Sequence, residues 1–139
     1  MTRFKFRIWD KAVGKMSYDV ALHSDRVIAK LCDGYVPYTE DRLKDIEIMQ
    51  CTGLKDKHGK LIYEGDRIAP FDEDDDKVSI EWDEERARFC LRVDYVDSDY
   101  WNGLYYEEKR GSDIYEIDDF YLDGYEVIGN IYEGVEVCT

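Results

Sequence analysis

The sequence predicts an α+β protein that is mainly β, built around a small barrel or a strongly bent sheet. Several short stretches alternate apolar and polar residues, which is the period of a half-buried strand, and turn residues separate these stretches. Twelve of the 139 residues are tyrosines, a residue type favoured in strands. Short strands joined by turns, with little helix, are typical of a barrel or bent sheet rather than of a parallel sheet.

The N-terminal region, residues 1–45, predicts a hairpin and a short helix. Phe4, Phe6 and Ile8 alternate with Lys5, Arg7 and Trp9, turn residues follow at 10–15, and residues 16–20 supply a returning strand. Apolar residues at helix-compatible spacing, after a serine or aspartate cap, predict a helix within residues 22–31. A glycine and a proline predict a loop over residues 33–41.

The remaining residues, 46–139, predict the barrel region, and the whole chain is expected to be a single unit. Strands are expected at 46–51, 67–71, 78–82, 89–95 and 125–132. An acidic loop is expected at 72–76 and a turn at 97–103, after which residues 104–107 and 114–117 are expected to pair around Gly111.

The charge of the chain is strongly negative and unevenly placed. There are 33 acidic residues against 19 basic ones, a formal net charge of −14. Residues 1–68 carry 13 basic and 11 acidic residues, whereas residues 69–139 carry 6 and 22. Because a nucleic-acid backbone is bound by a basic surface, this composition argues against a protein whose main surface binds the phosphates of DNA or RNA.

The cysteines indicate a reduced, metal-free protein. Cys32, Cys51, Cys90 and Cys138 are scattered without a C-x-x-C pair, and only two histidines are available to complete a zinc site. No apolar run approaches the roughly 20 residues of a membrane span, and the N-terminal residues lack the apolar stretch of a signal peptide. We therefore expect a cytoplasmic protein with free thiols that does not bind membranes.

Three blocks of the sequence, near its start, middle and end, form a recognisable pattern. The central block is Met49-Gln50-Cys51-Thr52-Gly53-Leu54-Lys55-Asp56-Lys57-His58-Gly59-Lys60-Leu61-Ile62-Tyr63-Glu64-Gly65-Asp66, and the other two are residues 4–10 and 125–133. These blocks resemble the YopX family, whose members occur in bacteriophages and prophages, with residues 4–10 similar to its opening and residues 125–133 similar to its closing strand. The family usually has tyrosine at the position of Cys51 and asparagine at that of His58, so neither residue gains a special role from it.

The resemblance implies a fold containing an SH3-like barrel, assembly as a homo-oligomer and no established biochemical activity. The resemblance therefore assigns the SH3-like barrel to residues 46–139, and the N-terminal hairpin region, residues 1–45, precedes it. The residues that form the structural signature are Gly53, Gly59, Gly65, Asp66 and Gly129. We expect the glycines to serve backbone geometry, with a positive φ at Gly53 or Gly65 and a loss of stability on replacement by alanine.

Two ligand-binding alternatives are weaker than their structural explanations. Lys55, Lys57 and Lys60 near the central glycines could face an anion, but neither phosphate-loop spacing is present, so turns are favoured. Asp72, Asp74 and Asp76 imitate the start of a calcium loop, but a lysine stands where that loop needs glycine. We predict no metal site and no cofactor.

Catalytic arrangements are not predicted either. Neighbouring carboxylates such as Glu84 and Glu85, or those at 107–108 and 118–119, would point to opposite faces of a strand and could not share one substrate atom. Cys90 lies in an apolar alternating stretch, which predicts a buried and unreactive thiol. The sequence therefore favours a protein that is not an enzyme.

Two functions from different classes are compatible with these observations. The first is a non-enzymatic, self-assembling interaction module that binds a host or phage protein, with an interface at Phe4, Phe6, Ile8 and Trp9 if the first strand is an open pairing edge. The second is an acidic mimic of DNA that occupies the basic groove of a host DNA-binding protein. Both predict protein partners and no direct contact with nucleic acid.

Overall fold

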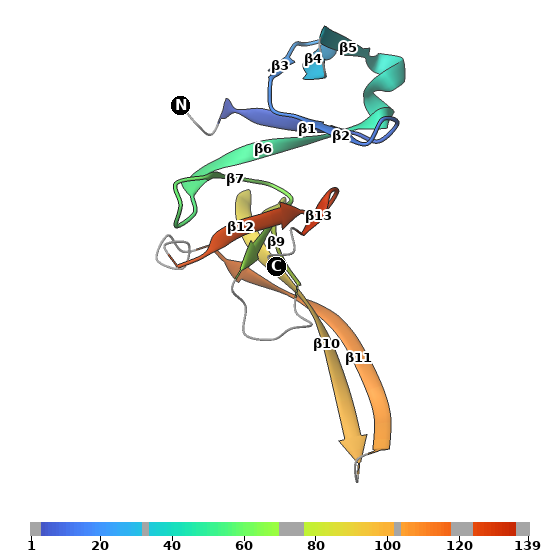
Figure 1. Cartoon of the computed structure of the whole chain (residues 1–139), viewed down its shortest axis with the longest axis vertical. Coiled ribbons are helices and arrows are strands. Elements are labelled where there is room, and N and C mark those ends of the chain that lie inside the picture. The colour runs from blue at the N-terminus through green and yellow to red at the C-terminus, as the bar shows by residue number, and fades with distance from the viewer. Residues whose placement is uncertain (1–3, 32–33, 70–76, 102–103, 118–123, 136–139) are drawn as a thin grey trace. The chain divides into compact units, whose positions relative to one another are not determined.

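The computed structural model describes residues 4–31, 34–69, 77–101, 104–117 and 124–135, and nearly all of the regular structure in them is strand (Figure 1). The chain forms two compact units. Unit 1 comprises Met1–Leu54 and Leu61–Tyr63, and unit 2 comprises Lys55–Lys60 and Glu64–Thr139. The prediction of a mainly β protein is confirmed.

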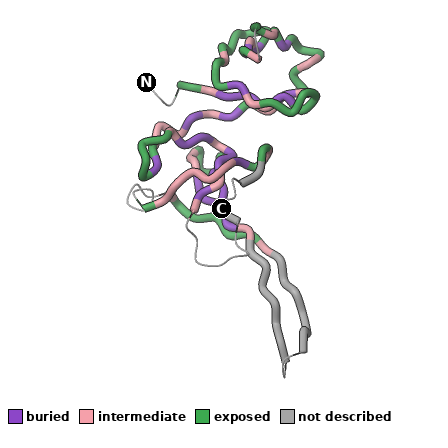
Figure 2. Tube along the Cα trace, viewed as in Figure 1, coloured by how far each residue is buried: buried purple, intermediate pink, exposed green. Residues whose placement is uncertain are grey.

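Unit 1 contains a sheet in which the predicted N-terminal hairpin is confirmed. Strands β1 (Phe6–Asp10) and β2 (Lys15–Ser17) pair antiparallel, and the sheet order is β2-β1-β6-β7, with β6 at Ile46–Lys55 and β7 at Leu61–Tyr63. The turn between β1 and β2 is set by Asp10, whose Oδ1 accepts hydrogen bonds from the amides of Ala12 and Val13. Figure 2 shows buried stretches on these strands and exposed ones on the turns.

A second, three-stranded sheet of unit 1 replaces the predicted helix and loop. Its order is β3-β4-β5, with β3 at Val20–Leu22, β4 at Arg26–Leu31 and β5 at Gly34–Thr39. The prediction of a helix within residues 22–31 is therefore wrong. The prediction of a loop at 33–41 is wrong for the residues that form β5. In β4 the buried Val27 and Ala29 alternate with more exposed residues, so the true period is two. Pro37 is tolerated because β5 is an edge strand.

The core of unit 1 lies among residues of both sheets. Its buried members are Ile8, Val27, Ala29, Tyr38 and Ile46. The short 3₁₀ helix η2 (Glu40–Asp45) then leads from β5 into β6. Because β6 pairs with β1 along Phe6–Asp10, residues 46–54 belong with the N-terminal hairpin rather than with the later strands.

Unit 2 is built on a six-stranded sheet. Its order is β11-β10-β9-β8-β12-β13, and its strands are β8 (Asp66–Ala69), β9 (Lys77–Asp83), β10 (Arg88–Trp101), β11 (Leu104–Glu116), β12 (Glu126–Asn130) and β13 (Gly134–Val135). The expected strands at 67–71, 78–82, 89–95 and 125–132 correspond to β8, β9, the first half of β10 and β12. Buried apolar residues at alternate positions, such as Val78 with Ile80 and Leu91 with Val93, form one face.

The long hairpin of β10 and β11 replaces a predicted turn and a predicted pairing of two shorter strands. The turn expected at 97–103 is strand as far as Trp101, and the two segments expected to pair around Gly111 are one continuous strand. In the observed register Gly111 lies opposite Tyr95 of β10, so the glycine continues the ladder instead of turning the chain. The predicted acidic loop at 72–76, and with it the calcium-like spacing, lies outside the described residues.

Candidate functional site

The central signature block places a buried carboxylate in unit 2. Asp56 is 7% exposed, and its Oδ1 accepts hydrogen bonds from the amides of His58 and Lys60, both at 2.9 Å. Its Oδ2 accepts one from the amide of Val127 in β12 at 3.0 Å. The Lys57 amide also donates to the Tyr125 carbonyl oxygen at 2.9 Å. The last two hydrogen bonds therefore connect the turn at 55–60 to residues 125–127 at the start of β12.

These bonds set the charge state of Asp56. Burial by itself would raise the pKa of this carboxyl, but the hydrogen bonds from the amides of Val127, Lys60 and His58 outweigh it and lower the pKa below its ordinary value. A carboxylate that accepts three backbone amides has little capacity left for a ligand. Asp56 therefore has the surroundings of a structural residue.

The signature glycines serve backbone geometry, as predicted. Gly53, Gly59 and Gly65 have φ values of 83°, 80° and 87°, in the left-handed region that favours glycine. Gly65 also bridges two chain segments, since its amide donates to the Ile80 carbonyl oxygen at 2.7 Å and its carbonyl oxygen accepts from the Ile131 amide at 2.9 Å. Gly129 lies at a register shift in the pairing of β12 with β8.

Asp66 and the three signature lysines differ sharply in burial. Asp66 begins β8, is 2% exposed and lies opposite Asn130 of β12. Lys55, Lys57 and Lys60 are exposed. Because backbone geometry explains the glycines and the lysines extend into solvent, the anion-binding alternative gains no support from this block. Within the described residues, no group of three or more histidine, cysteine, aspartate or glutamate side chains is placed to hold a metal ion.

A network of charged side chains covers one face of β9, β10 and β11 in unit 2. Arg92 contacts Glu81 at 3.1 Å, Asp94 at 2.9 Å and the Ser112 hydroxyl at 3.3 Å. The Ser112 hydroxyl in turn donates to Asp94 at 2.6 Å. This bond first, and then the Arg92 guanidinium, lower the pKa of Asp94 against the effect of burial. The three strands thus share one cross-strand network.

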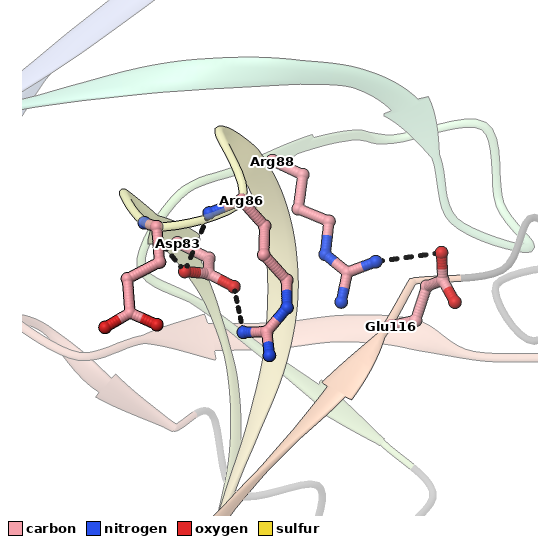
Figure 3. Close-up of polar contacts among 5 residues, drawn as sticks. Asp83, Arg86, Arg88 and Glu116 are labelled. Carbon is pink, nitrogen blue, oxygen red and sulfur yellow. Dashed lines mark hydrogen bonds and ion pairs between the residues drawn. The ribbon is translucent and has the colours of Figure 1, made fainter.

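The same face continues toward the β9–β10 turn, where Figure 3 shows two more arginine–carboxylate pairs. Arg86 contacts Asp83 at 3.2 Å, and Arg88 contacts Glu116 of β11 at 2.9 Å. Asp83 also accepts the amides of Glu85 and Arg86, which shapes the turn. Three arginines therefore contact four carboxylates on this face, because Arg92 is shared between Glu81 and Asp94.

Cys90 lies in the middle of this face and is 2% exposed. Burial first, and then the carboxylates of Asp83 and Glu81, raise the pKa of its thiol. The predicted burial of Cys90 is confirmed. Cys51 in β6 is buried and free as well, while Cys32 and Cys138 lie outside the described residues.

The comparison with protein families decides the affiliation of the chain. A family model described as YopX protein matches residues 5–137, nearly the whole sequence. The chain belongs to the YopX family. A search of curated proteins gives no match. Among solved structures, the crystal structure of protein EF1440 from Enterococcus faecalis is similar, with 26% identity, 93% of each chain covered and a TM-score of 0.45.

The predicted interface residues of this YopX protein lie in different surroundings. Phe4 is 57% exposed and Phe6 and Trp9 are half-buried, but Ile8 is fully buried in the core of its own unit. Strand β1 has hydrogen-bonded neighbours on both sides, β2 and β6. The first strand is therefore not the open pairing edge on which that prediction depended, and Ile8 is not accessible to a second molecule.

Sequence reasoning missed the two best-organised polar features of this YopX protein. The signal for Asp56 was present, because an aspartate followed by a glycine three residues later is typical of a turn held by the aspartate side chain. The Arg92 network had no such signal, since its members come from three strands.

No helix in the described part of the chain is long and apolar enough to cross a membrane.

Proposed function

We propose that this YopX protein is a non-enzymatic interaction module that assembles with copies of itself through unit 1. The observation that carries the proposal is that unit 1 combines exposed apolar side chains with almost no net charge. The two parts of this observation, the charge and the apolar surface, are independent of each other.

The negative charge of the chain belongs to unit 2. Unit 1 contains nine basic and eight acidic residues, a net charge of +1, whereas unit 2 contains ten basic and 25 acidic residues, a net charge of −15. Two copies of unit 2 therefore repel each other over the screening length of about 8 Å at physiological ionic strength. Two copies of unit 1 approach without that cost.

Apolar side chains are exposed beside the N-terminal hairpin of unit 1. Phe4 is 57% exposed and Ile48 of β6 is 42% exposed. Ile48 lies opposite Ile8, so it shares a face with Phe6 at a diagonal position of the β1–β6 pair. An isolated exposed apolar residue is ordinary, but several on a neutral unit favour a contact with another protein surface.

The geometry favours this module over the two other functions. An enzyme needs a poised nucleophile or acid–base pair, whereas the thiols of Cys51 and Cys90 are buried and the carboxylates of the charged face are paired with arginines. A mimic of DNA needs an unbroken row of negative charge. On the described charged face, Arg86, Arg88 and Arg92 interrupt that row.

The proposal is tested by the mass of the protein in solution. Multi-angle light scattering at micromolar concentration should give a multiple of 16.5 kDa, and Ile48→Ser should shift the population toward the monomer. Val13→Ser is the matched control, because Val13 is an equally apolar residue that is 57% exposed on the β1–β2 turn. A mass of 16.5 kDa at every concentration would refute self-assembly. An Ile48→Ser protein with unchanged mass would refute its placement.

A further inference from the structure

At one end of the apolar face shared by β9, β10 and β11, aromatic side chains are exposed to solvent. Trp82 in β9 is 42% exposed and Tyr115 in β11 is 52% exposed. Phe89 of β10 lies directly opposite Trp82, and the two rings meet edge to face with their centres 5.0 Å apart. Tyr115 lies opposite Leu91, so it is diagonal to Phe89 on the same face. We call Trp82, Phe89 and Tyr115 the aromatic patch.

Three exposed carboxylates lie close in sequence to the aromatic patch. Glu84 and Glu85 follow Trp82 in the β9–β10 turn, and Asp113 lies two residues before Tyr115 on the same face of β11. None of these three carboxylates makes an ion pair or a hydrogen bond with another described residue. The patch therefore combines aromatic rings with negative charge that no described basic side chain neutralises.

The neighbouring arginines of unit 2 are engaged elsewhere. Arg86, Arg88 and Arg92 all contact other carboxylates, and Figure 3 shows the pairs of the first two. Arg88 and Arg92 are also an odd number of positions from Phe89 along β10, which places them on the opposite face of the sheet. The two faces thus differ in chemistry, with paired charges on one and aromatic rings beside unpaired carboxylates on the other.

Aromatic rings beside unpaired carboxylates form a surface that suits a cation. The faces of tryptophan and tyrosine rings attract a guanidinium or ammonium group, and carboxylates add charge-assisted hydrogen bonds. A guanidinium suits such a surface better than an ammonium, because it is planar, stacks on aromatic rings and is more weakly hydrated. The chemistry of the patch therefore favours arginine as the side chain that it binds.

The charge of the two units indicates that the arginines come from another protein. Unit 2 has a net charge of −15, so it repels both the phosphates of a nucleic acid and a second copy of itself. The described arginines of unit 1 are not available on a second copy either. Arg7 is 1% exposed, while Arg26 and Arg42 contact aspartates of their own unit at 3.6 Å and 4.0 Å.

We propose that the aromatic patch and its neighbouring carboxylates bind an arginine-rich segment of another protein. The exposed rings of Trp82 and Tyr115 take the guanidinium groups of the partner, and Glu84, Glu85 and Asp113 accept their hydrogen bonds. This surface lies in unit 2, so the inference does not depend on the self-assembly through unit 1.

Calorimetric titration of the full-length protein with two defined peptides tests the proposal. One peptide alternates arginine with glycine, and the other carries lysine at the same positions, so the two have the same charge. The wild-type protein should bind the arginine peptide about three- to fivefold more tightly, because stacking of the guanidinium adds to the attraction between opposite charges. Equal binding of the two peptides, or no binding of either, would overturn the proposal.

Replacement of the exposed rings locates the binding surface. The double variant Trp82→Leu with Tyr115→Leu keeps the charge of the chain and should bind the arginine peptide at least about fivefold more weakly. Tyr35→Leu is the control, because Tyr35 is 63% exposed on β5 of unit 1. Circular dichroism checks that each variant retains its strands, and the comparison of peptides on the wild type stands whether or not a variant folds.

A second pair of variants separates a local contact from a general attraction to the acidic chain. Glu84→Gln with Glu85→Gln removes two adjacent charges beside the patch and should weaken binding of the arginine peptide about threefold. Glu40→Gln with Asp41→Asn removes two adjacent charges from exposed positions of η2 in unit 1, so the net charge changes equally. Equal losses in the two double variants would overturn the placement at the patch.

The outcomes also distinguish this inference from the proposed self-assembly. Losses of binding confined to the variants of the patch support the proposal, whether the wild-type protein is an oligomer or a monomer. Failure of the peptides to bind leaves the contact through unit 1 standing, because the solution mass tests that contact. A mass that falls toward the monomer in Trp82→Leu with Tyr115→Leu, while arginine binding is unchanged, would show that the patch contacts a second copy and would overturn the proposal.

Discussion

At the scale of single residues, Asp56 is the clearest link between sequence and structure in this YopX protein. Its carboxylate accepts three backbone amides, two from its own turn and one from β12, and so joins the central block of the family to the closing strand. A charged acceptor suits this position because its bonds to amides are stronger than neutral ones. The same bonds explain why the pKa of Asp56 is lowered although burial opposes it.

Replacing Asp56 by asparagine should therefore destabilise the protein. The substitution removes the charge and turns one acceptor into a donor that faces a backbone amide, so we expect a loss of about 2–3 kcal/mol in the free energy of unfolding at pH 7. Because the folded pKa is below the unfolded value, the contribution of Asp56 is present above about pH 4 and lost as pH falls through the folded pKa.

Urea denaturation at pH 7 and pH 3 measures both effects. The difference between wild type and Asp56→Asn should be large at pH 7 and smaller at pH 3. Asp113→Asn removes one negative charge from an exposed position of β11 and should change stability by less than about 0.5 kcal/mol. Equal losses in the two variants would contradict the role assigned to the hydrogen bonds of Asp56.

At the scale of elements, a buried tyrosine connects the two sheets of unit 1. The Tyr38 hydroxyl in β5 donates to Oδ2 of Asp10 at 2.6 Å, while Oδ1 of the same aspartate holds the β1–β2 turn. Burial first, and then the bond to Asp10, raise the pKa of Tyr38, so its hydroxyl remains a donor. The Arg42 guanidinium lies 4.9 Å from the centre of the Tyr38 ring.

Tyr38→Phe should loosen this connection. The ring that fills the core is retained, but the Asp10 carboxylate loses a buried donor, and we expect a loss of about 1–3 kcal/mol. Tyr35→Phe is the matched control, because the Tyr35 hydroxyl donates to Asp19 at 3.1 Å on a side chain that is 63% exposed. Thermal unfolding followed by circular dichroism compares the two, and a control as destabilised as Tyr38→Phe would contradict the argument.

At the scale of the whole molecule, charge is the dominant property. The formal net charge is −14, and unit 2 exceeds it with −15. The described arginine–carboxylate pairs relieve only part of the repulsion within unit 2, because solvent-exposed pairs contribute little individually. Salt should therefore matter more for the stability of this protein than for that of a typical domain.

Raising the NaCl concentration from about 10 mM to about 150 mM at pH 8 should raise the unfolding temperature, because the screening length shortens from about 30 Å to about 8 Å. The stabilisation should disappear at pH 4.5, which is close to the pI, because the net charge is then near zero. Differential scanning calorimetry at the two salt concentrations measures this. An unfolding temperature independent of salt at pH 8 would show that self-repulsion is unimportant.

Much of the local structure was predictable from the sequence. The hairpin of β1 and β2, the strands β9 and β12 and the left-handed glycines follow from alternation and from turn chemistry, which act over a few residues. The errors were also local in origin. Val27, Ile28 and Leu31 suit one face of a helix, but Val27 and Ala29 are buried together once β5 and the core residues of unit 1 cover them.

The sequence by itself determined the mainly β class, the excess of acidic residues and the membership in the YopX family, because composition, alternation and motifs do not depend on distant contacts. The tertiary structure decided which residues meet. It placed Ile8 inside its own unit, brought Asp56 to Val127 and assembled the Arg92 network from three strands. It also placed β11 outermost among the described strands of its sheet, because strand order follows from pairings between residues far apart in the chain.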